Sequence, residues 1–259
     1  GVIGGTTRPS TIDISATGVA RTLSIDQDLS STSNQTLTAA GGITISGART
    51  FTSTSGTINT ASALSGNNSF DISGNADIDG AITGITTFSV SGTSNIGADV
   101  TTSSTQTYSG AVTLSANVDL TGTTVTTNGT VAGGTNNLTV TGNAVFGDAT
   151  ADTVTGVAVL DITGNTTIHT DTITTSSTQT YGDATSDTIT IGTNTTLTTT
   201  DSQITFSGTV DSETSETNNL TLDAGTSEVQ FDAETGGTVG LGAIGITGAL
   251  DLDAAITNA

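Results

Sequence analysis

His169 is the only histidine among the 259 residues, and the sequence contains neither cysteine nor lysine. A histidine that acts as a base needs a second side chain that orients it or that it activates. The surrounding segment, TTIHTDT at 166–172, supplies no nucleophile of the cysteine or lysine type. We therefore expect His169 at a solvated position or in a ladder of stacked surface side chains, and we assign no catalytic residue.

A second candidate for chemistry is the segment from Asn75 to Gly80, which resembles the first half of a calcium loop. Its oxygen-bearing residues and its glycine have the required spacing, but the twelfth position, which should be Glu, is Thr86. An Asp-Gly corner between two strands would look identical. Calcium therefore stays an open alternative, and we assign no metal ligand and no cofactor-binding residue.

The carboxylates are numerous but scattered among threonine and serine. Lyases and hydrolases that cleave polysaccharides need clustered carboxylates, or a base beside them. The three arginines, Arg8, Arg21 and Arg49, all lie near the amino terminus, far along the sequence from most of the acids. This distribution predicts a protein that is not an enzyme.

The formal net charge is −21, from 24 acids against three basic residues. Such a surface repels the phosphates of nucleic acids and of anionic lipids. No apolar run approaches the ~20 residues that a membrane-spanning helix needs. We expect neither nucleic-acid binding nor membrane insertion.

Repeats dominate the organisation of the chain. TTSSTQTY occurs at 101–108 and again at 174–181, and a degenerate copy, SSTSNQTL, occupies 30–37. These copies mark super-repeats of about 70 residues, at approximately 30–100, 101–173 and 174–249. We expect one domain, residues 1–259, built by duplication.

A shorter unit lies inside the super-repeat. It reads apolar, any, apolar, Ser/Thr, Gly, with a further apolar residue four positions after the glycine. Its copies are ITISGARTF at 43–51, FDISGNADI at 70–78, FSVSGTSNI at 88–96, LTVTGNAVF at 138–146, LDITGNTTI at 160–168 and IGITGALDL at 244–252. We expect the glycines, at 47, 74, 92, 142, 164 and 248, to form sharp corners by adopting positive φ angles.

This unit predicts one coil of a solenoid. Alternating Val, Ile and Thr favour strands, repeats of 20–50 residues are typical of solenoids and propellers, and the unit is too short for a four-stranded propeller blade. Coils that stack about 4.8 Å apart pair their backbones and bury a narrow core, which accounts for a hydrophobic content of only 32%. The expected fold is all-β, a right-handed parallel β-helix of about ten coils.

The segments SGAVTLSANVDLTG, NNLTVTGNAVFG and NNLTLDAG, together with TTSSTQTY, resemble the repeats of filamentous-haemagglutinin-type proteins. The resemblance covers most of residues 30–259. It implies a secreted adhesin of the two-partner secretion group, with a right-handed parallel β-helix and a location at a bacterial cell surface or outside the cell. The amino-terminal secretion module of that family is missing from this sequence.

The first functional hypothesis is therefore a structural shaft of an adhesin or surface fibre. Neither GVIGGTTRPS nor LDLDAAITNA resembles the polar cap that would protect the open edge of a solenoid. The rod therefore continues in a longer chain, or copies of this chain stack end to end as a filament. A third hypothesis is a β-helix that binds or processes carbohydrate, with glycans or proteins of a host or surface as partners.

Overall fold

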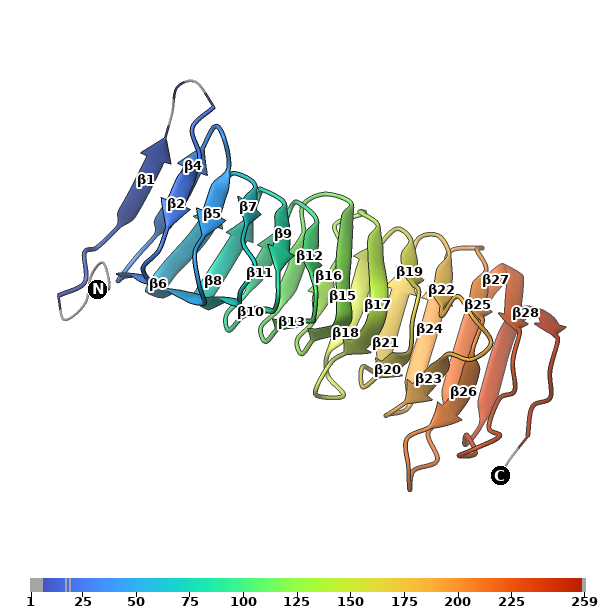
Figure 1. Ribbon diagram of the computed structural model, residues 1–259. Coiled ribbons are helices and arrows are strands. Elements are labelled where there is room, and N and C mark those ends of the chain that lie inside the picture. The colour runs from blue at the N-terminus through green and yellow to red at the C-terminus, as the bar shows by residue number, and fades with distance from the viewer. Residues whose placement is uncertain (1–6, 17, 19, 258–259) are drawn as a thin grey trace. The chain divides into compact units, whose positions relative to one another are not determined.

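The computed structural model describes residues 7–16, 18 and 20–257, which form strands, turns and no helix (Figure 1). Because the described residues form no helix, none of them belongs to a helix that could cross a membrane. The start of GVIGGTTRPS lies outside them. The chain divides into two compact units, residues 1–123 and 124–259. The expected parallel β-solenoid is confirmed, with about 11 turns in the two units together rather than about ten.

Unit 1 has three faces, each a file of parallel strands that we name after its first strand. The β1 face contains β1 (Ile12–Ala16), β4 (Gln35–Ala39), the second halves of β6 (Arg49–Thr60) and β8 (Phe70–Ile78), β11 (Ser94–Ile96) and β14 (Val112–Leu114). The β2 face contains β2 (Leu23–Ile25), β5 (Ile43–Ile45), β7 (Leu64–Ser65), β9 (Ile82–Ile85), β12 (Val100–Thr102) and the start of β15 (Val118–Thr127). The β3 face contains β3 (Leu29–Ser31), the first halves of β6 and β8, β10 (Phe88–Val90) and β13 (Thr105–Tyr108).

Unit 2 is built in the same way. Its β16 face contains β16 (Val131–Ala132), β18 (Thr153–Val157), β21 (Thr172–Thr175), β24 (Thr195–Thr199) and the first halves of β27 (Leu220–Phe231) and β28 (Ile244–Leu252). Its β17 face contains the first half of β17 (Leu138–Phe146), β19 (Leu160–Ile162), β22 (Gln179–Tyr181), β25 (Ile204–Phe206) and the second halves of β27 and β28. Its β20 face contains the second half of β17, β20 (Thr166–Ile168), β23 (Thr188–Ile191) and β26 (Thr209–Ser212), and ends in bridges at Thr235 and Ile256.

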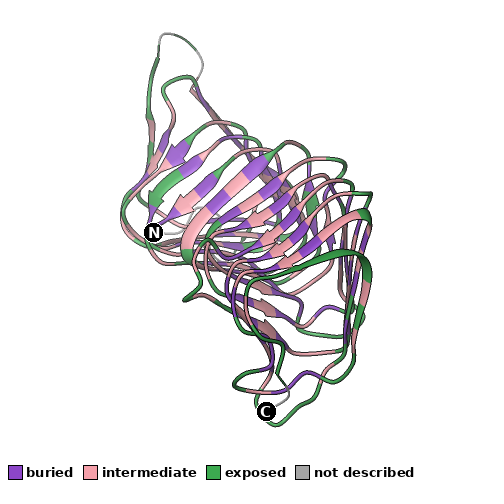
Figure 2. Cartoon of the chain, turned by 90° about the vertical axis from the view of Figure 1, so that its right-hand side faces the viewer, coloured by how far each residue is buried: buried purple, intermediate pink, exposed green. Residues whose placement is uncertain are grey.

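The core of each unit is a column of inward-facing side chains, and buried and half-buried residues alternate along the strands (Figure 2). In unit 1, Phe51, Phe70, Phe88 and Tyr108 form a ladder with ring centroids 4.8 to 5.9 Å apart. In unit 2, Tyr181, Phe206 and Phe231 stack nearly parallel, with centroids 5.2 and 5.0 Å apart. Aromatic pairs at these distances stabilise the fold beyond the area that they bury.

The recurring segment TTSSTQTY forms a strand, a corner at its two serines and a second strand, as its sequence predicts. In the first copy these strands are β12 and β13, with Ser103 and Ser104 between them. The degenerate copy at 30–37 forms β3 and β4 instead. Within unit 1 the two copies therefore lie at different corners, because the residues between them do not complete a whole number of turns.

Each copy of the segment carries one buried glutamine. Gln35, Gln106 and Gln179 are fully buried, and each side-chain amide nitrogen donates to a backbone carbonyl of the next coil, at 2.6, 2.8 and 2.9 Å. The bonded residues lie 17, 15 and 19 positions apart in the sequence. A buried amide is tolerated only when it is hydrogen-bonded, so the three glutamines fasten successive coils together.

The corner glycines follow two rules rather than the single rule expected. Positive φ angles are found at Gly47, Gly74, Gly142 and Gly248, as predicted. Gly92 and Gly164 do not have them, and for these two the prediction is wrong. A Cβ atom on Gly92 would lie 2.5 Å from the side-chain oxygen of Asn75 and 2.7 Å from the carbonyl of Gly74. Gly92 is therefore required because the stacked coils approach each other too closely there for a side chain.

The two blocks that follow TTSSTQTY differ by an outward loop, which the unequal spacing after the tyrosines predicts. Three residues separate Tyr108 from β14, whereas residues 182–187 separate Tyr181 from β23. Asp183, Thr185 and Ser186 in this loop are exposed. The carboxylate of Asp187 closes the loop by accepting the backbone N–H groups of Asp183 and Ala184 at 3.0 and 3.1 Å.

Candidate functional site

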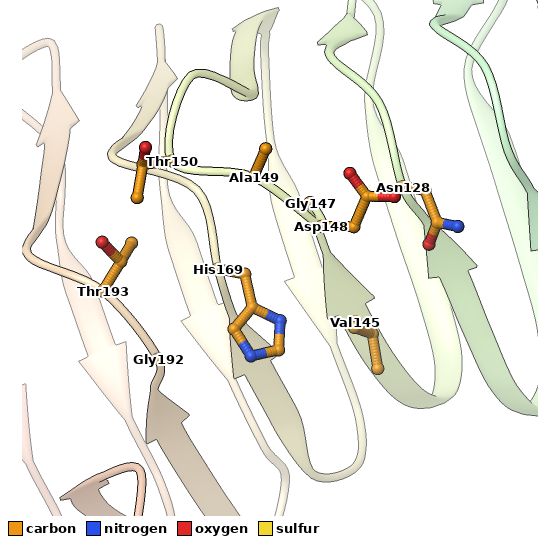
Figure 3. Close-up of a pocket in the computed structure, with 9 residues that line it drawn as sticks. All are labelled: Asn128, Val145, Gly147, Asp148, Ala149, Thr150, His169, Gly192 and Thr193. Carbon is orange, nitrogen blue, oxygen red and sulfur yellow. The ribbon is translucent and has the colours of Figure 1, made fainter. Parts of the chain in front are cut away.

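A hollow of about 450 Å³ opens on the surface of unit 2, around the single histidine (Figure 3). Its lining consists of Asn128, Val145, Gly147, Asp148, Ala149, Thr150, His169, Gly192 and Thr193. Figure 3 shows the side chain of Asp148 beside that of Asn128, on the side of the hollow away from Thr193. The hollow therefore combines small apolar side chains with amide, carboxylate, imidazole and hydroxyl groups.

The residues of this hollow come together because they occupy equivalent corners of successive coils. Each follows a strand of one coil and donates its backbone N–H to the coil before: Asp148 to Asn128, His169 to Phe146 and Gly192 to Ile168, at 3.1, 2.8 and 2.8 Å. The loop between β17 and β18 forms one wall. Asp152 holds that loop by accepting the N–H groups of Asp148 and Ala149.

His169 lies at a partly exposed surface position of unit 2, in agreement with the solvated position that is one of the two expected for it. Its imidazole Nε2 is 3.4 Å from the carboxylate Oε2 of Glu213, which follows β26 two coils away. The ring spans the intervening coil at Gly192, where a Cβ atom would overlap the imidazole. Both side chains are partly exposed, at 32% and 46%, so the contact contributes little to stability.

The lining of the hollow offers several groups that can form hydrogen bonds. Within residues 7–16, 18 and 20–257, no three His, Cys, Asp or Glu side chains gather as metal ligands would. His169 contacts the carboxylate of Glu213, and the lining adds the hydroxyls of Thr150 and Thr193. The side chains present can donate to and accept from the hydroxyl groups of a small polar ligand.

No family model, curated protein or solved structure matches this chain.

The fold is compatible with β-helical repeat proteins in general. This chain shares its repeat architecture and the parallel pairing of its strands with β-helical repeat proteins.

The segment with calcium-loop spacing is part of a ladder in unit 1. Residues 75–78 belong to the extended strand β8, whereas a calcium loop curls so that its oxygens converge on one point. The carboxylate of Asp77 accepts the side-chain amides of Asn59 and Asn95, at 2.7 and 2.8 Å. Asp77 and Asn95 also line a second hollow, of about 350 Å³. Gly80 is a glycine because a Cβ atom there would overlap the backbone of Ser62.

Corner asparagines form a set of hydrogen bonds between coils that the sequence analysis did not single out. The side-chain oxygen of Asn143 accepts the N–H of Asn165, and Asn165 in turn accepts the N–H of Thr188 one coil further on. Asn194 and Asn219 form the same relationship, at 2.8 Å. The signal that could have revealed them is the recurrence of Asn or Asp one coil apart, which the abundance of these residues obscures.

Proposed function

We propose that this chain is a non-enzymatic structural protein, a shaft segment of an adhesin or surface fibre. One observation carries the proposal. Within each unit, successive coils keep the inward-facing positions in register, although paired positions are separated by 18 residues at Phe70 and Phe88 and by 25 at Ile204 and Val229. The differences in coil length lie in loops, so the stacked core is preserved, as a rigid spacer requires.

The repeats resemble those of filamentous-haemagglutinin-type adhesins, and this resemblance supports a location at a bacterial cell surface or outside the cell. The composition agrees with such a setting. The sequence contains no lysine and three arginines, so a trypsin-like protease finds few cleavage sites. Immunogold labelling of intact source cells with an antibody to the chain tests the location: surface label is expected, and label confined to the cell interior would refute it.

A shaft must hold its two ends at a defined distance, and spin labels measure this directly. The chain has no cysteine, so labels can be placed on Thr54→Cys in unit 1 and Thr214→Cys in unit 2, both at exposed positions. We expect a narrow distance distribution. A matched pair within unit 1, at Thr54 and Thr93, sets the width that a single unit gives. A much broader distribution for the pair that spans both units would contradict the shaft.

The hollow around His169 favours a second candidate function, the binding of carbohydrate. Asn128, Asp148 and Thr193 offer donors and acceptors for sugar hydroxyls, and Val145 and Ala149 offer apolar surface for a sugar ring. A glycan panel screened by thermal shift tests this function. We expect a shift that His169→Ala abolishes, and the absence of any shift across the panel would eliminate it.

A further inference from the structure

Asn128 and Gly129 form the only Asn-Gly pair in the sequence. The side-chain amide carbon of an asparagine, Cγ, can be attacked by the backbone nitrogen of the residue that follows it. A Cβ atom on that residue crowds the attack, and glycine has none. Every other asparagine in the chain is followed by a residue with a side chain, so the sequence favours this reaction at Asn128 alone.

The structure leaves both reacting groups of this pair without a hydrogen bond. Asn128 and Gly129 are half-buried and lie between β15 and β16. No described residue bonds to the side chain of Asn128, and none accepts the N–H of Gly129. The side chains of Asn143, Asn165 and Asn194, by contrast, each accept a backbone N–H of the next coil. The side chain of Asn128 is therefore free to turn towards the nitrogen of Gly129.

Water reaches the pair from the hollow around His169. Asn128 is one of the residues that line this hollow (Figure 3). Its backbone carbonyl accepts the N–H of Asp148 at 3.1 Å, which holds the corner without occupying either reacting group. The pair therefore combines a free side-chain amide, a free backbone nitrogen and access to the water that the reaction consumes.

We propose that Asn128 is a site of self-modification, at which the folded chain converts this asparagine to aspartate and isoaspartate. The nitrogen of Gly129 forms a bond to Cγ of Asn128 and gives up its proton. The bond from Cγ to the side-chain nitrogen breaks, so ammonia leaves and a cyclic imide remains. Water then opens the imide. Cleavage between Cγ and the glycine nitrogen gives aspartate, whereas cleavage between the backbone carbonyl carbon and the glycine nitrogen gives isoaspartate.

The product changes what the hollow offers to a ligand. An amide donates and accepts hydrogen bonds, whereas a carboxylate only accepts them. The side chains of Asn128 and Asp148 lie beside each other (Figure 3), so the modified chain has two carboxylates on this side of the hollow. Unit 2 contains no arginine or lysine that could neutralise them. The modified hollow therefore favours ligands that carry hydrogen-bond donors or a positive charge.

Peptide mapping by mass spectrometry tests the proposal on the parent chain. Purified protein is held at mildly alkaline pH, where the nitrogen of Gly129 loses its proton more readily, and is sampled over time. We expect the peptide that contains Asn128 to show the mass gain that replaces NH2 by OH, and to separate into two products. A chain whose Asn128 stays intact, or loses its amide no faster than the other asparagines, would overturn the proposal.

Asp79→Asn provides a matched control, because it creates a second Asn-Gly pair in unit 1. The N–H of Gly80 donates to the carbonyl of Thr60 at 2.8 Å, so this nitrogen is engaged, unlike that of Gly129. We expect the new amide to persist in the folded variant and to be lost in urea as fast as that of Asn128. Equal loss at both positions in the folded variant would overturn the selection of Asn128 by the fold.

Two variants at the pair itself identify the reacting groups. Gly129→Ala adds a Cβ atom beside the nitrogen, and Gly129 is not among the glycines with positive φ, so alanine suits its backbone. Asn128→Gln lengthens the side chain and disfavours ring closure. Both variants should keep their amides while the parent chain loses its own, and circular dichroism checks that they fold. Loss at the parent's rate from either variant would contradict the mechanism. The mass change is measured on the chain alone, so the inference depends on neither the shaft nor sugar binding.

Discussion

The hydroxyl of Tyr108 donates a hydrogen bond to Oε1 of Gln106, 2.9 Å away, in the interior of unit 1. Tyr181 and Gln179 repeat this bond at the same distance in unit 2. Burial raises the pKa of both phenols far above the usual range, so the proton stays on the oxygen and the phenol remains a donor. In the degenerate copy Leu37 stands in place of the tyrosine, and Oε1 of Gln35 has no partner.

Removing the phenol oxygen should weaken unit 1. Tyr108→Phe keeps the ring beside Phe88 but leaves Oε1 of Gln106 buried without a donor. An unsatisfied buried acceptor costs about 1–3 kcal/mol, so we expect the free energy of unfolding to fall by that amount. Urea denaturation followed by circular dichroism measures it. Thr107→Val, on the outward side of the same strand, is the matched control and should change stability by less than ~0.5 kcal/mol.

The two buried glutamines in unit 1, Gln35 and Gln106, provide an internal comparison. The side chain of Gln106 bonds to two backbone carbonyls and to Tyr108, whereas that of Gln35 bonds to one carbonyl and one hydroxyl and has an unsatisfied oxygen. Gln106→Met should therefore lower stability more than Gln35→Met, by about 1–3 kcal/mol, since it orphans an additional buried group. Equal losses in urea denaturation would show that the tyrosine bond contributes nothing.

These glutamines also show how far the sequence alone can be interpreted. The alternation in FDISGNADI and its relatives predicts the strands correctly, because an inward apolar residue at every second position is a local property. The retention of TTSSTQTY signals a constraint, but its cause is a bond from Gln106 to the next coil, and the partner of that bond lies 15 residues away in the sequence. Contacts between coils depend on register, which no single repeat contains.

The glycines illustrate the same limit. Gly74 and Gly92 occupy equivalent places in the repeat, and the sequence predicts positive φ for both. Only Gly74 has it, at 137°, whereas Gly92 is needed because the corner at Gly74 lies against it. The hollow around His169 was not predicted for a similar reason. It forms from corners of four coils, and its lining residues are ordinary surface types when considered one at a time.

Substitution by alanine should separate the glycines that are crowded from those that are not. A Cβ atom on Gly92 would lie 2.5 Å from Oδ1 of Asn75, whereas the nearest atoms to a Cβ on Gly245 are 4.0 Å away. Gly92→Ala should destabilise by about 1–3 kcal/mol, as overpacking does. Gly245→Ala should be neutral or stabilising by up to ~1 kcal/mol, because it restricts the unfolded chain. Thermal and urea denaturation measure both, and a neutral Gly92→Ala would contradict the close stacking of these corners.

Stability at acid pH should depend on Asp201. Its carboxylate accepts hydrogen bonds from the backbone N–H and from the hydroxyl of Thr226, at 2.9 and 3.0 Å. These two bonds lower the pKa of Asp201. The folded-state pKa of Asp201 lies below the unfolded value of about 3.9. Asp201 therefore adds to the free energy of unfolding at every pH above that value. This contribution is lost as the pH falls through the folded pKa.

Asp201→Asn isolates this contribution from those of the other acids. Asn keeps the acceptor oxygen and tolerates the φ of 48° at this position, but it does not titrate. We therefore expect urea denaturation midpoints of the variant to fall less steeply than those of the parent chain as the pH drops below about 5. Parallel profiles for the two proteins would show that Asp201 is not the linked group.

The loop at 183–186 should be dispensable. Its deletion joins Gly182 to Asp187 and restores, after Tyr181, the spacing found after Tyr108, where the next β-branched residue follows four positions later. The deleted residues contribute no strand, and short changes in loop length cost little closure entropy, so we expect stability to change by less than about 1 kcal/mol. Deleting residues 188–191 instead removes β23 and its inward-facing Ile189 and Ile191, and should unfold the surrounding coils. Equal losses of unfolding free energy for the two deletions, measured by urea denaturation, would show that residues 182–187 belong to the stacked core.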